Sequence, residues 1–178
     1  MSGQTASVEP VWPRDLFGAL KAWKVGLVAH VPDAGHKRLI EMCDADNGMR
    51  VAPLATEEDG VALLAGGSLG GLRGALLMQS SGVGNCINML GLPRICRLPL
   101  LMLITMRGEW GEFNPWQVSM GQATEETLKA VGVLVLRADA PEDVAATVEA
   151  AARLAFEGPA AVALLLGQRL IGSKSFAK

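Results

Sequence analysis

Aromatic residues are scarce in this chain of 178 residues: they make up 4% of the sequence, and tyrosine is absent. Histidine is rarer still, with two residues, and the three cysteines, Cys43, Cys86 and Cys96, show no CxxC spacing. A structural zinc site requires closely spaced Cys and His ligands. We therefore expect no metal site within this chain, and reduced thiols in a cytoplasmic protein.

A strong charge excess and a long apolar run are missing as well. The formal net charge is −2, which gives no electrostatic attraction to nucleic acid. A membrane span requires roughly 20 consecutive apolar residues, and the most apolar stretch, residues 98–106, is much shorter. The first residues also lack the basic start and apolar segment of a signal peptide. We therefore expect neither a nucleic-acid partner nor a membrane partner.

The chain does contain a regular alternation of apolar strands and helices, in a sequence that is 50% hydrophobic. This alternation is typical of a three-layer α/β fold, a doubly wound sheet of about six parallel strands with right-handed crossovers. We expect a flexible segment at residues 1–12, one domain at 13–166 and a basic, mobile tail at 167–178. The predicted strands are 25–31, 50–53, 75–79, 98–105, 133–136 and 160–166, and the predicted helices are 13–23, 36–43, 57–67, 84–92, 124–130 and 141–156.

Two polar segments follow predicted strands and are expected at the same edge of the sheet. The acidic run Thr56-Glu57-Glu58-Asp59-Gly60 opens a helix, where carboxylates complement the helix dipole. Ser80-Ser81-Gly82-Val83-Gly84-Asn85 is interpreted as a glycine-rich turn, although it lacks the lysine and the spacing of a nucleotide-binding loop. Taken alone, each segment is either a structural feature or one wall of a ligand crevice.

Residues 106–121 show no helical or strand period and are long for a connection inside a compact domain. They contain Trp110, Phe113 and Trp116. These aromatic side chains either plug a loop or a partner surface, or contact a substrate directly. His36 is expected to be a solvated helix residue, and Asp33 to cap that helix.

Together these motifs resemble the alpha subunits of sulfopyruvate and phosphonopyruvate decarboxylases, which carry the pyrimidine-binding domain of thiamine-diphosphate enzymes. Glu58-Asp59-Gly60 matches the glutamate two residues before a glycine, and residues 80–85 match a Ser-Gly-x-Gly-Asn loop. The next segment is also similar to these alpha subunits: it begins with Arg107-Gly108, contains Gln117 and ends with Met120-Gly121. The likeness extends from about residue 16 to 166.

The resemblance implies that Glu58, and not Glu57, is the catalytic carboxylate. In that role Glu58 shares a proton with ring nitrogen N1′ of the cofactor's aminopyrimidine and thereby activates it. The glycines would let the backbone approach the cofactor, and Asn85 would cap the following helix. The implied cofactor-binding residues are Glu58, Gln79, Ser80, Ser81, Gly82, Gly84 and Asn85.

The implied substrate is a small 2-oxo acid, and the candidate contacts are His30, Asp33, Arg107 and Gln117. The Val31-Pro32-Asp33 turn is similar to that of phosphonopyruvate decarboxylases. A doubly anionic substrate needs cationic partners, and the candidates are Arg94, Arg97 and Arg107. If they point away from the site, a singly charged 2-oxo acid is favoured.

The chain lacks the Gly-Asp-Gly motif, with an asparagine downstream, that holds the cofactor's diphosphate and Mg²⁺ in this superfamily. The resemblance therefore implies an alpha subunit that works with a beta subunit, in an alpha2-beta2 or larger assembly, and that releases carbon dioxide and an aldehyde. Two alternatives stay open: a subunit of a split acetolactate-synthase-like carboligase, or a non-catalytic α/β binding module.

Overall fold

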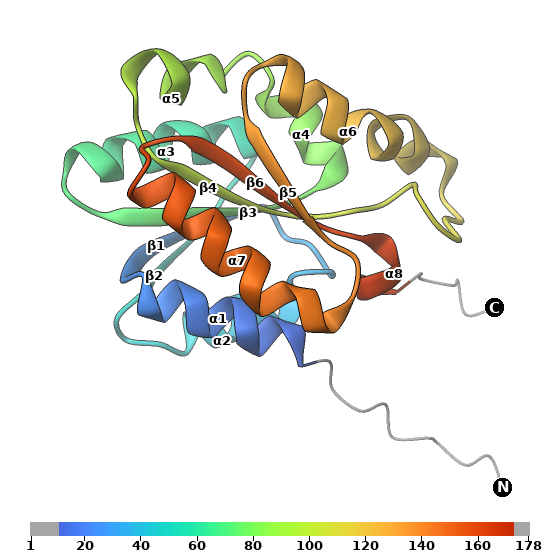
Figure 1. Cartoon of the computed structure of the whole chain (residues 1–178), viewed down its shortest axis with the longest axis horizontal. Coiled ribbons are helices and arrows are strands. Elements are labelled where there is room, and N and C mark those ends of the chain that lie inside the picture. Colours follow the sequence, from blue (N-terminus) through green and yellow to red (C-terminus); the bar gives the residue numbers. More distant parts are fainter. Residues whose placement is uncertain (1–10, 173–178) are drawn as a thin grey trace, which may run out of the picture.

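The computed structural model describes residues 11–172, which form one six-stranded sheet with helices on both faces (Figure 1). Every strand pair is parallel, and the strand order is β2-β1-β3-β4-β6-β5. The predicted three-layer, doubly wound parallel sheet is thus confirmed. The strands are β1 (Val25–His30), β2 (Arg50–Pro53), β3 (Arg73–Gln79), β4 (Leu100–Thr105), β5 (Leu134–Ala138) and β6 (Ala161–Leu166).

The helices divide into two layers. On one face of the sheet α1 packs against α7 and α2, and on the other face α4 packs against α3 and α6 (Figure 1). Each layer has its own apolar cluster against the sheet. The α-helices are α1 (Trp12–Ala22), α2 (Lys37–Asp44), α3 (Glu57–Leu69), α4 (Ser80–Cys86), α5 (Gly91–Cys96), α6 (Val118–Ala130), α7 (Pro141–Phe156) and α8 (Gln168–Ile171), and Pro115–Gln117 form a single 3-10 turn, η1.

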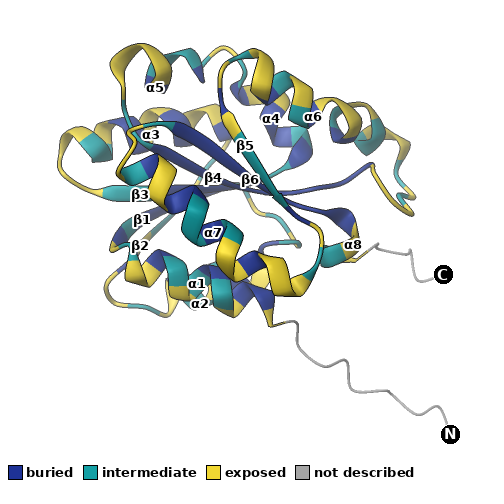
Figure 2. Ribbon diagram, in the orientation of Figure 1, coloured by how far each residue is buried: buried dark blue, intermediate teal, exposed yellow. Residues whose placement is uncertain are grey.

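The central strands are buried on both faces, as Figure 2 shows for β4 and β6. Their sequences, Leu-Leu-Met-Leu-Ile-Thr and Ala-Val-Ala-Leu-Leu-Leu, are nearly continuous apolar runs. Such runs are typical of parallel strands that helices cover on both sides. The core is therefore formed by these strands and the two helical layers.

The chain changes direction in the sheet between β1 and β3. After β1 it enters α2 on one face, and after β3 it enters α4 on the opposite face. Where crossovers leave neighbouring strands on opposite faces, a crevice opens outside the carboxyl ends of those strands. The loop after β1 and the start of α4 meet at this crevice.

Several predicted boundaries differ from the structure. The predicted turn at 80–85 is helical and belongs to α4, and the predicted helix at 84–92 is divided into α4 and α5. Pro93 does not end a helix but lies in the first turn of α5, where its missing N–H is not needed. Helix α6 begins at Val118, six residues earlier than predicted.

The expected terminal segments fall largely outside the described residues, namely 1–10 and 173–178. Within the description, Trp12 opens α1 and is 4% exposed, because its ring packs into the core beside α1 and α2. Gln168 in α8 is 1% exposed. Both residues thus belong to the folded body rather than to a free end.

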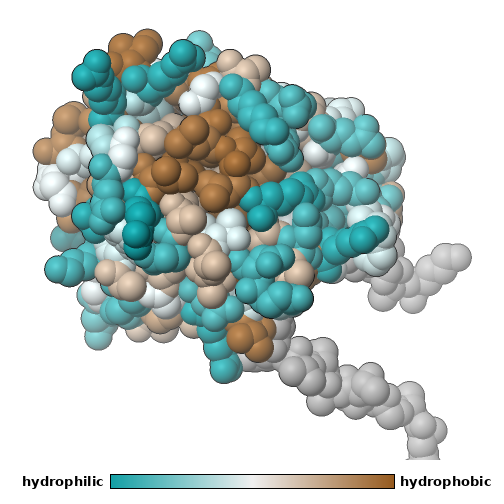
Figure 3. Space-filling view, viewed as in Figure 1, coloured by the Kyte–Doolittle hydropathy of each residue, from teal (hydrophilic) through white to brown (hydrophobic). Residues whose placement is uncertain are grey.

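Apolar side chains gather on the surface over β5 and β6, between α6 and α7 (Figure 3). Leu134 on β5 is 45% exposed and Leu154 on α7 is 40% exposed. Strand β5 lies at the edge of the sheet and so pairs only with β6. Of the helices in the described part of the chain, none has the length and apolar character that crossing a membrane requires.

Truncation of a core leucine tests this packing. Leu103 lies in the centre of β4 and is fully buried, so we expect Leu103→Ala to lower the free energy of unfolding by about 2–5 kcal/mol. The matched control is Leu69→Ala, at the end of α3, where the side chain is 78% exposed and the expected change is about 0.5 kcal/mol or less. Urea unfolding of the full chain measures both, and equal losses would contradict the assigned core.

Candidate functional site

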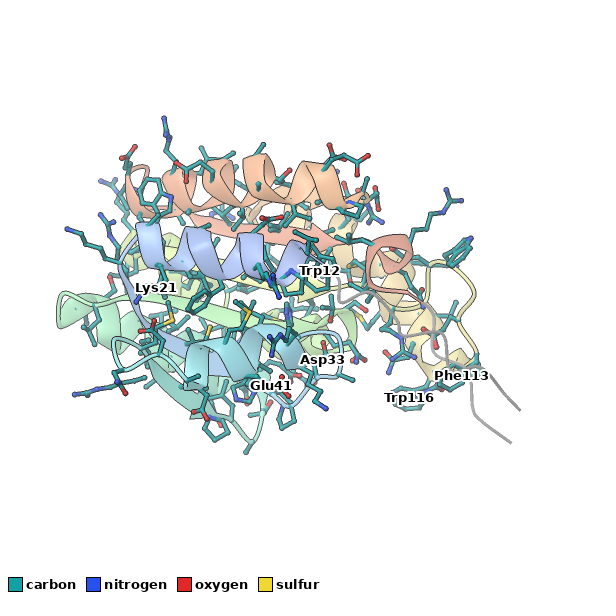
Figure 4. The ribbon with its side chains drawn as sticks, turned by 90° about the horizontal axis from the view of Figure 1, so that it is seen from below. Trp12, Lys21, Asp33, Glu41, Phe113 and Trp116 are labelled. Carbon is teal, nitrogen blue, oxygen red and sulfur yellow. The ribbon has the colours of Figure 1, made fainter. Side chains whose placement is uncertain are left out.

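Asp33, labelled in Figure 4, lies in the loop after β1, at the crevice between β1 and β3. Gln79 Nε2 donates to Asp33 Oδ1 over 3.1 Å, and Thr105 Oγ1 donates to Asp33 Oδ2 over 2.5 Å. Burial raises the pKa of Asp33, but His36 and the hydrogen bonds outweigh it, so its pKa is lowered overall. Asp33 is therefore an ionised anchor between three strand ends and not the helix cap that the sequence predicted.

Both histidines lie near this anchor. His36 is fully buried, with Nε2 2.9 Å from the Leu103 carbonyl oxygen, and burial lowers its pKa. The prediction of a solvated His36 is thus wrong, because the ring fits between α2 and the sheet. His30 is 8% exposed, and its Nδ1 has no hydrogen-bond partner among the described residues. It lines a pocket of about 370 Å³ with Pro32, Asp33 and Lys37 among its other walls.

The acidic run at the start of α3 separates into buried and exposed carboxylates. Glu57 is 8% exposed and accepts a hydrogen bond of 2.8 Å from Asn85 Nδ2. A Cβ atom on Gly82 would collide with the Glu57 carboxylate, so the glycine makes room for it. Glu58 is exposed on the same helical turn. Glu57 therefore joins α3 to α4, and Glu58 is free to meet a ligand or a partner.

Segment 80–86 supports the site in a way that the sequence did not predict. Ser80 is fully buried, and its Oγ accepts a hydrogen bond of 3.1 Å from the Arg107 backbone N–H. Gly82 is also buried, and neither Gly82 nor Gly84 has a positive φ. Asn85 binds Glu57 and does not cap a helix. Ser80 and Gly82 are thus structural, which leaves Ser81, Gly84 and Asn85 facing outward.

These outward residues line a groove of about 610 Å³ between α4 and the beginning of α6. Ser81 Oγ donates to Gln79 Oε1 over 3.1 Å, which links the groove to the Asp33 anchor. Trp116 stands on the rim, 81% exposed, and projects from the molecule beside Phe113 (Figure 4). The lining residues are Ser81, Gly84, Asn85, Pro115, Trp116, Ser119 and Met120.

The loop after β4 is organised by a buried ion pair. Arg107 Nε and Nη2 each donate to Glu112 over 2.6 Å, and their side chains are 10% and 4% exposed. This pair lowers the pKa of Glu112 to about 2, although burial opposes the shift. Gly108 and Gly121 allow this loop to cross the start of α6, because a Cβ on either glycine would collide with backbone atoms.

The other substrate candidates lie in different places. Gln117 precedes α6, and its Oε1 is buried without a hydrogen-bond partner in the described part of the chain. Arg94 and Arg97 lie in and directly after α5, which leads into the amino end of β4. Both are therefore at the opposite end of the sheet from Asp33. Of the three arginine candidates, only Arg107 lies at the carboxyl edge.

Sequence reasoning missed three residues at this edge, namely Thr105, Glu112 and Gln168. Thr105 and Gln168 are polar residues at or just after the ends of the apolar strands β4 and β6. Polar residues at the end of a strand also mark residues 80–85, so the same signal in the sequence predicts Thr105 and Gln168. Glu112 lies inside the loop after β4 and not at a strand end, so this signal does not select it, although Arg107, Gly108 and Asn114 of the same loop are among its partners.

The outward residues fit one end of thiamine diphosphate. The amide of Asn85 and the hydroxyls of Ser81 and Ser119 can pair with a polar heterocycle in the groove, and Met120 and Trp116 offer apolar contact. Glu58 is exposed at the first turn of α3 and is not one of the residues that line the groove. No group of three or more His, Cys, Asp or Glu side chains among residues 11–172 could hold a metal ion. The groove thus offers polar and apolar groups suited to a heterocycle such as the pyrimidine end of that cofactor.

Comparison with known proteins gives close relatives, although no family model matches the chain. The chain is 34% identical over 143 residues to sulfopyruvate decarboxylase subunit alpha of Methanococcus maripaludis, covering 80% of this chain and 86% of that protein. It is 34% identical over 116 residues to phosphonopyruvate decarboxylase of Streptomyces viridochromogenes, covering 64% of this chain and 29% of the relative.

Among solved structures, 2-oxoglutarate:ferredoxin oxidoreductase from Magnetococcus marinus is similar, with a TM-score of 0.74 and 15% identity. The match covers 90% of this chain and 29% of that larger one. At this identity the likeness shows a shared fold.

Replacement of Glu112 by Gln tests the buried ion pair. We expect Glu112→Gln to lower the free energy of unfolding by about 3–5 kcal/mol at neutral pH, since Arg107 is left buried without its counter-ion. Because the pKa of Glu112 falls from 4.5 to about 2 on folding, this stabilisation is present above pH 4.5 and is lost as the pH falls toward 2.

Urea unfolding of the full chain at a series of pH values measures the difference between the two proteins. It should shrink steadily between pH 4.5 and about 2. The control is Glu126→Gln on α6, whose side chain is 82% exposed and should change stability by about 0.5 kcal/mol or less. A Glu112→Gln difference that does not depend on pH would contradict the assigned pairing.

Proposed function

Because the chain belongs to the sulfopyruvate decarboxylase alpha-subunit family of thiamine-diphosphate enzymes, we propose that it is one half of a 2-oxo acid decarboxylase. In this proposal the complete enzyme releases carbon dioxide and an aldehyde. The second half is a beta subunit that holds the diphosphate and Mg²⁺, most simply in an alpha2-beta2 assembly. The alpha chain supplies a catalytic carboxylate and part of the substrate pocket.

The proposal rests on the different environments of Glu57 and Glu58, since Glu57 is buried and Glu58 is exposed. The Glu57 carboxylate is nearly buried, accepts a hydrogen bond from Asn85 and packs against Gly82, so it links α3 to α4. Glu58 is exposed at the first turn of α3, close enough to α4 to influence Cys86 electrostatically. An exposed carboxylate on a rigid helix end can reach a heterocycle held by a second subunit.

Thiamine diphosphate, when bound, supplies the electron sink that lets carbon dioxide leave a 2-oxo acid. Glu58 would hold the proton that it shares with ring nitrogen N1′ of the aminopyrimidine, which is proton-transfer catalysis by a positioned group. Glu57 and Asn85 fix the helix from which Glu58 projects. Ser81, Gly84 and Asn85 form the adjoining wall of the groove, which excludes water once the partner covers it.

In the proposed complex, substrate contacts come from the ends of β1 and β4. His30, whose buried Nδ1 has no hydrogen-bond partner among the described residues, lines the pocket beside Asp33, and Arg107 lines a smaller one with Asp33 and Thr105. Since Glu112 already compensates the charge of Arg107, this arginine brings no net positive charge to the pocket beside Asp33. Further cations for a sulfonate or phosphonate group would come from the partner, and a singly charged 2-oxo acid would need none.

Co-expression with a beta subunit of the family tests the assignment. The purified complex is assayed for thiamine-diphosphate binding, and for release of carbon dioxide from pyruvate, sulfopyruvate and phosphonopyruvate. Release of an aldehyde supports the decarboxylase, and joining of two 2-oxo acids would instead indicate a carboligase. A complex that neither binds the cofactor nor turns over any of these acids would refute the proposal.

Glu58→Gln is the decisive variant. We expect it to assemble normally and to lower turnover by at least about a hundredfold, since it loses a positioned proton-transfer group. Asp59→Asn, the next exposed carboxylate on the same turn, is the matched control and should stay within about threefold of the unmodified complex. The steady-state rate of carbon dioxide release measures both.

Glu57→Gln separates the two neighbouring glutamates. The amide oxygen of Gln can still accept the Asn85 hydrogen bond, so we expect turnover to fall by less than about tenfold. If Glu57→Gln abolishes turnover and Glu58→Gln does not, the catalytic assignment passes to Glu57. Sedimentation of each complex checks that assembly is intact.

A further inference from the structure

Gln168, which follows β6, is hydrogen-bonded to the loop after β4. It is 1% exposed at the start of α8, directly beyond β6. Its Oε1 accepts hydrogen bonds from the backbone N–H groups of Glu109 and Trp110, over 2.8 and 2.9 Å. Its Nε2 donates to Glu112 Oε2 over 2.9 Å. The amide thus uses both ends, and it joins the loop backbone to the buried ion pair.

Glu112 is the centre that Gln168 holds. Besides Arg107 and Gln168, its carboxylate accepts hydrogen bonds from the backbone N–H groups of Gly108 and Asn114, over 3.2 and 3.0 Å. With every lone pair directed to a donor, the carboxylate has one orientation. Arg107 is fixed in turn, since two parallel N–H···O bonds define the plane of a guanidinium.

One nitrogen of the fixed guanidinium, Nη1, is available for a hydrogen bond to a ligand. Nη1 of Arg107 makes no hydrogen bond to any residue in the described range 11–172, while Nε and Nη2 bind Glu112. Arg107 also lines a small pocket of about 90 Å³ together with Asp33 and Thr105. The ring of Phe113 lies 5.6 Å from the guanidinium carbon and limits its movement from another side.

We propose that Gln168 is a positioning residue that, through Glu112, aims the Nη1 edge of Arg107 at the 2-oxo carbonyl oxygen of the 2-oxo acid in the pocket beside Asp33. This inference rests on the proposed decarboxylase function. It adds that the C-terminal helix α8, which lies outside the motif segments, sets substrate affinity. Because Glu112 compensates the charge, Arg107 recognises the substrate by the direction of its N–H bonds rather than by net attraction.

Two variants of the co-expressed complex separate the two ends of the amide. Gln168→Met replaces the amide by an apolar side chain of similar size, so both the acceptor and the donor are lost. Gln168→Glu keeps an acceptor for the Glu109 and Trp110 amides but replaces the donor to Glu112 by a second acceptor. The control is Gln122→Met, at an exposed glutamine of α6 that has no part in the site. The measurements are KM and kcat for the best 2-oxo acid, and backbone amide exchange of the alpha chain.

For Gln168→Met we expect KM to rise at least about tenfold with kcat within about threefold, since a hydrogen bond to a charged group is worth about that factor. The amides of Glu109 and Trp110 should exchange at least about tenfold faster than in the unmodified complex. For Gln168→Glu we expect the same rise in KM while these two amides stay protected. Gln122→Met should match the unmodified complex in all three readouts.

An unchanged KM in Gln168→Glu would overturn the proposal, because the link from Gln168 to Arg107 would then have no effect on substrate binding. A smaller yield of folded complex with unaltered KM would also overturn it and leave Gln168 with a purely structural role. If the unmodified complex turns over no 2-oxo acid, the proposed function fails. Amide exchange tests the loop contact independently of turnover. If the amides of Glu109 and Trp110 still exchange slowly in Gln168→Met, their protection does not depend on Gln168, and this part of the proposal fails too.

Discussion

The ion pair between Arg107 and Glu112 sets the geometry of the carboxyl edge of the sheet. Both side chains are nearly buried, so each needs the other to offset the cost of leaving water. The backbone N–H of Arg107 is also bound by Ser80 at the end of β3, and Glu112 is bound by Gln168 beyond β6. Three adjacent strands are thereby tied at one point, and the loop after β4 becomes part of the scaffold.

Much of the fold follows from the sequence, because parallel strands covered on both faces must be apolar throughout. The bounds of β2 and α7 are as predicted, and the apolar runs of β4 and β6 locate the centre of the sheet. The glycine-rich segment at 80–86 is different, since glycine disfavours helices. It is helical here because α4 packs between α3 and α6, a tertiary effect that local sequence does not reveal.

The location of the candidate site could also be predicted, since polar residues at the carboxyl ends of parallel strands must meet. The roles of neighbouring carboxylates could not. Glu57 and Glu58 differ by one position on a helix, and which of them is buried depends on Gly82 and Asn85 of α4. The bond between Glu112 and Gln168 likewise joins residues 56 positions apart. Contacts of this kind are fixed by the assembled fold.

A rigid edge has a consequence for assembly with a second subunit. Association loses affinity wherever loops must be ordered at the interface, and here the loop after β4 is already held by Glu112, Gln168 and the glycine crossing at Gly108 and Gly121. Glu58 and Trp116 remain exposed on this frame. In the proposed complex the partner therefore meets a preformed wall, and its binding energy is available for closing the groove over the cofactor rather than for folding the alpha chain.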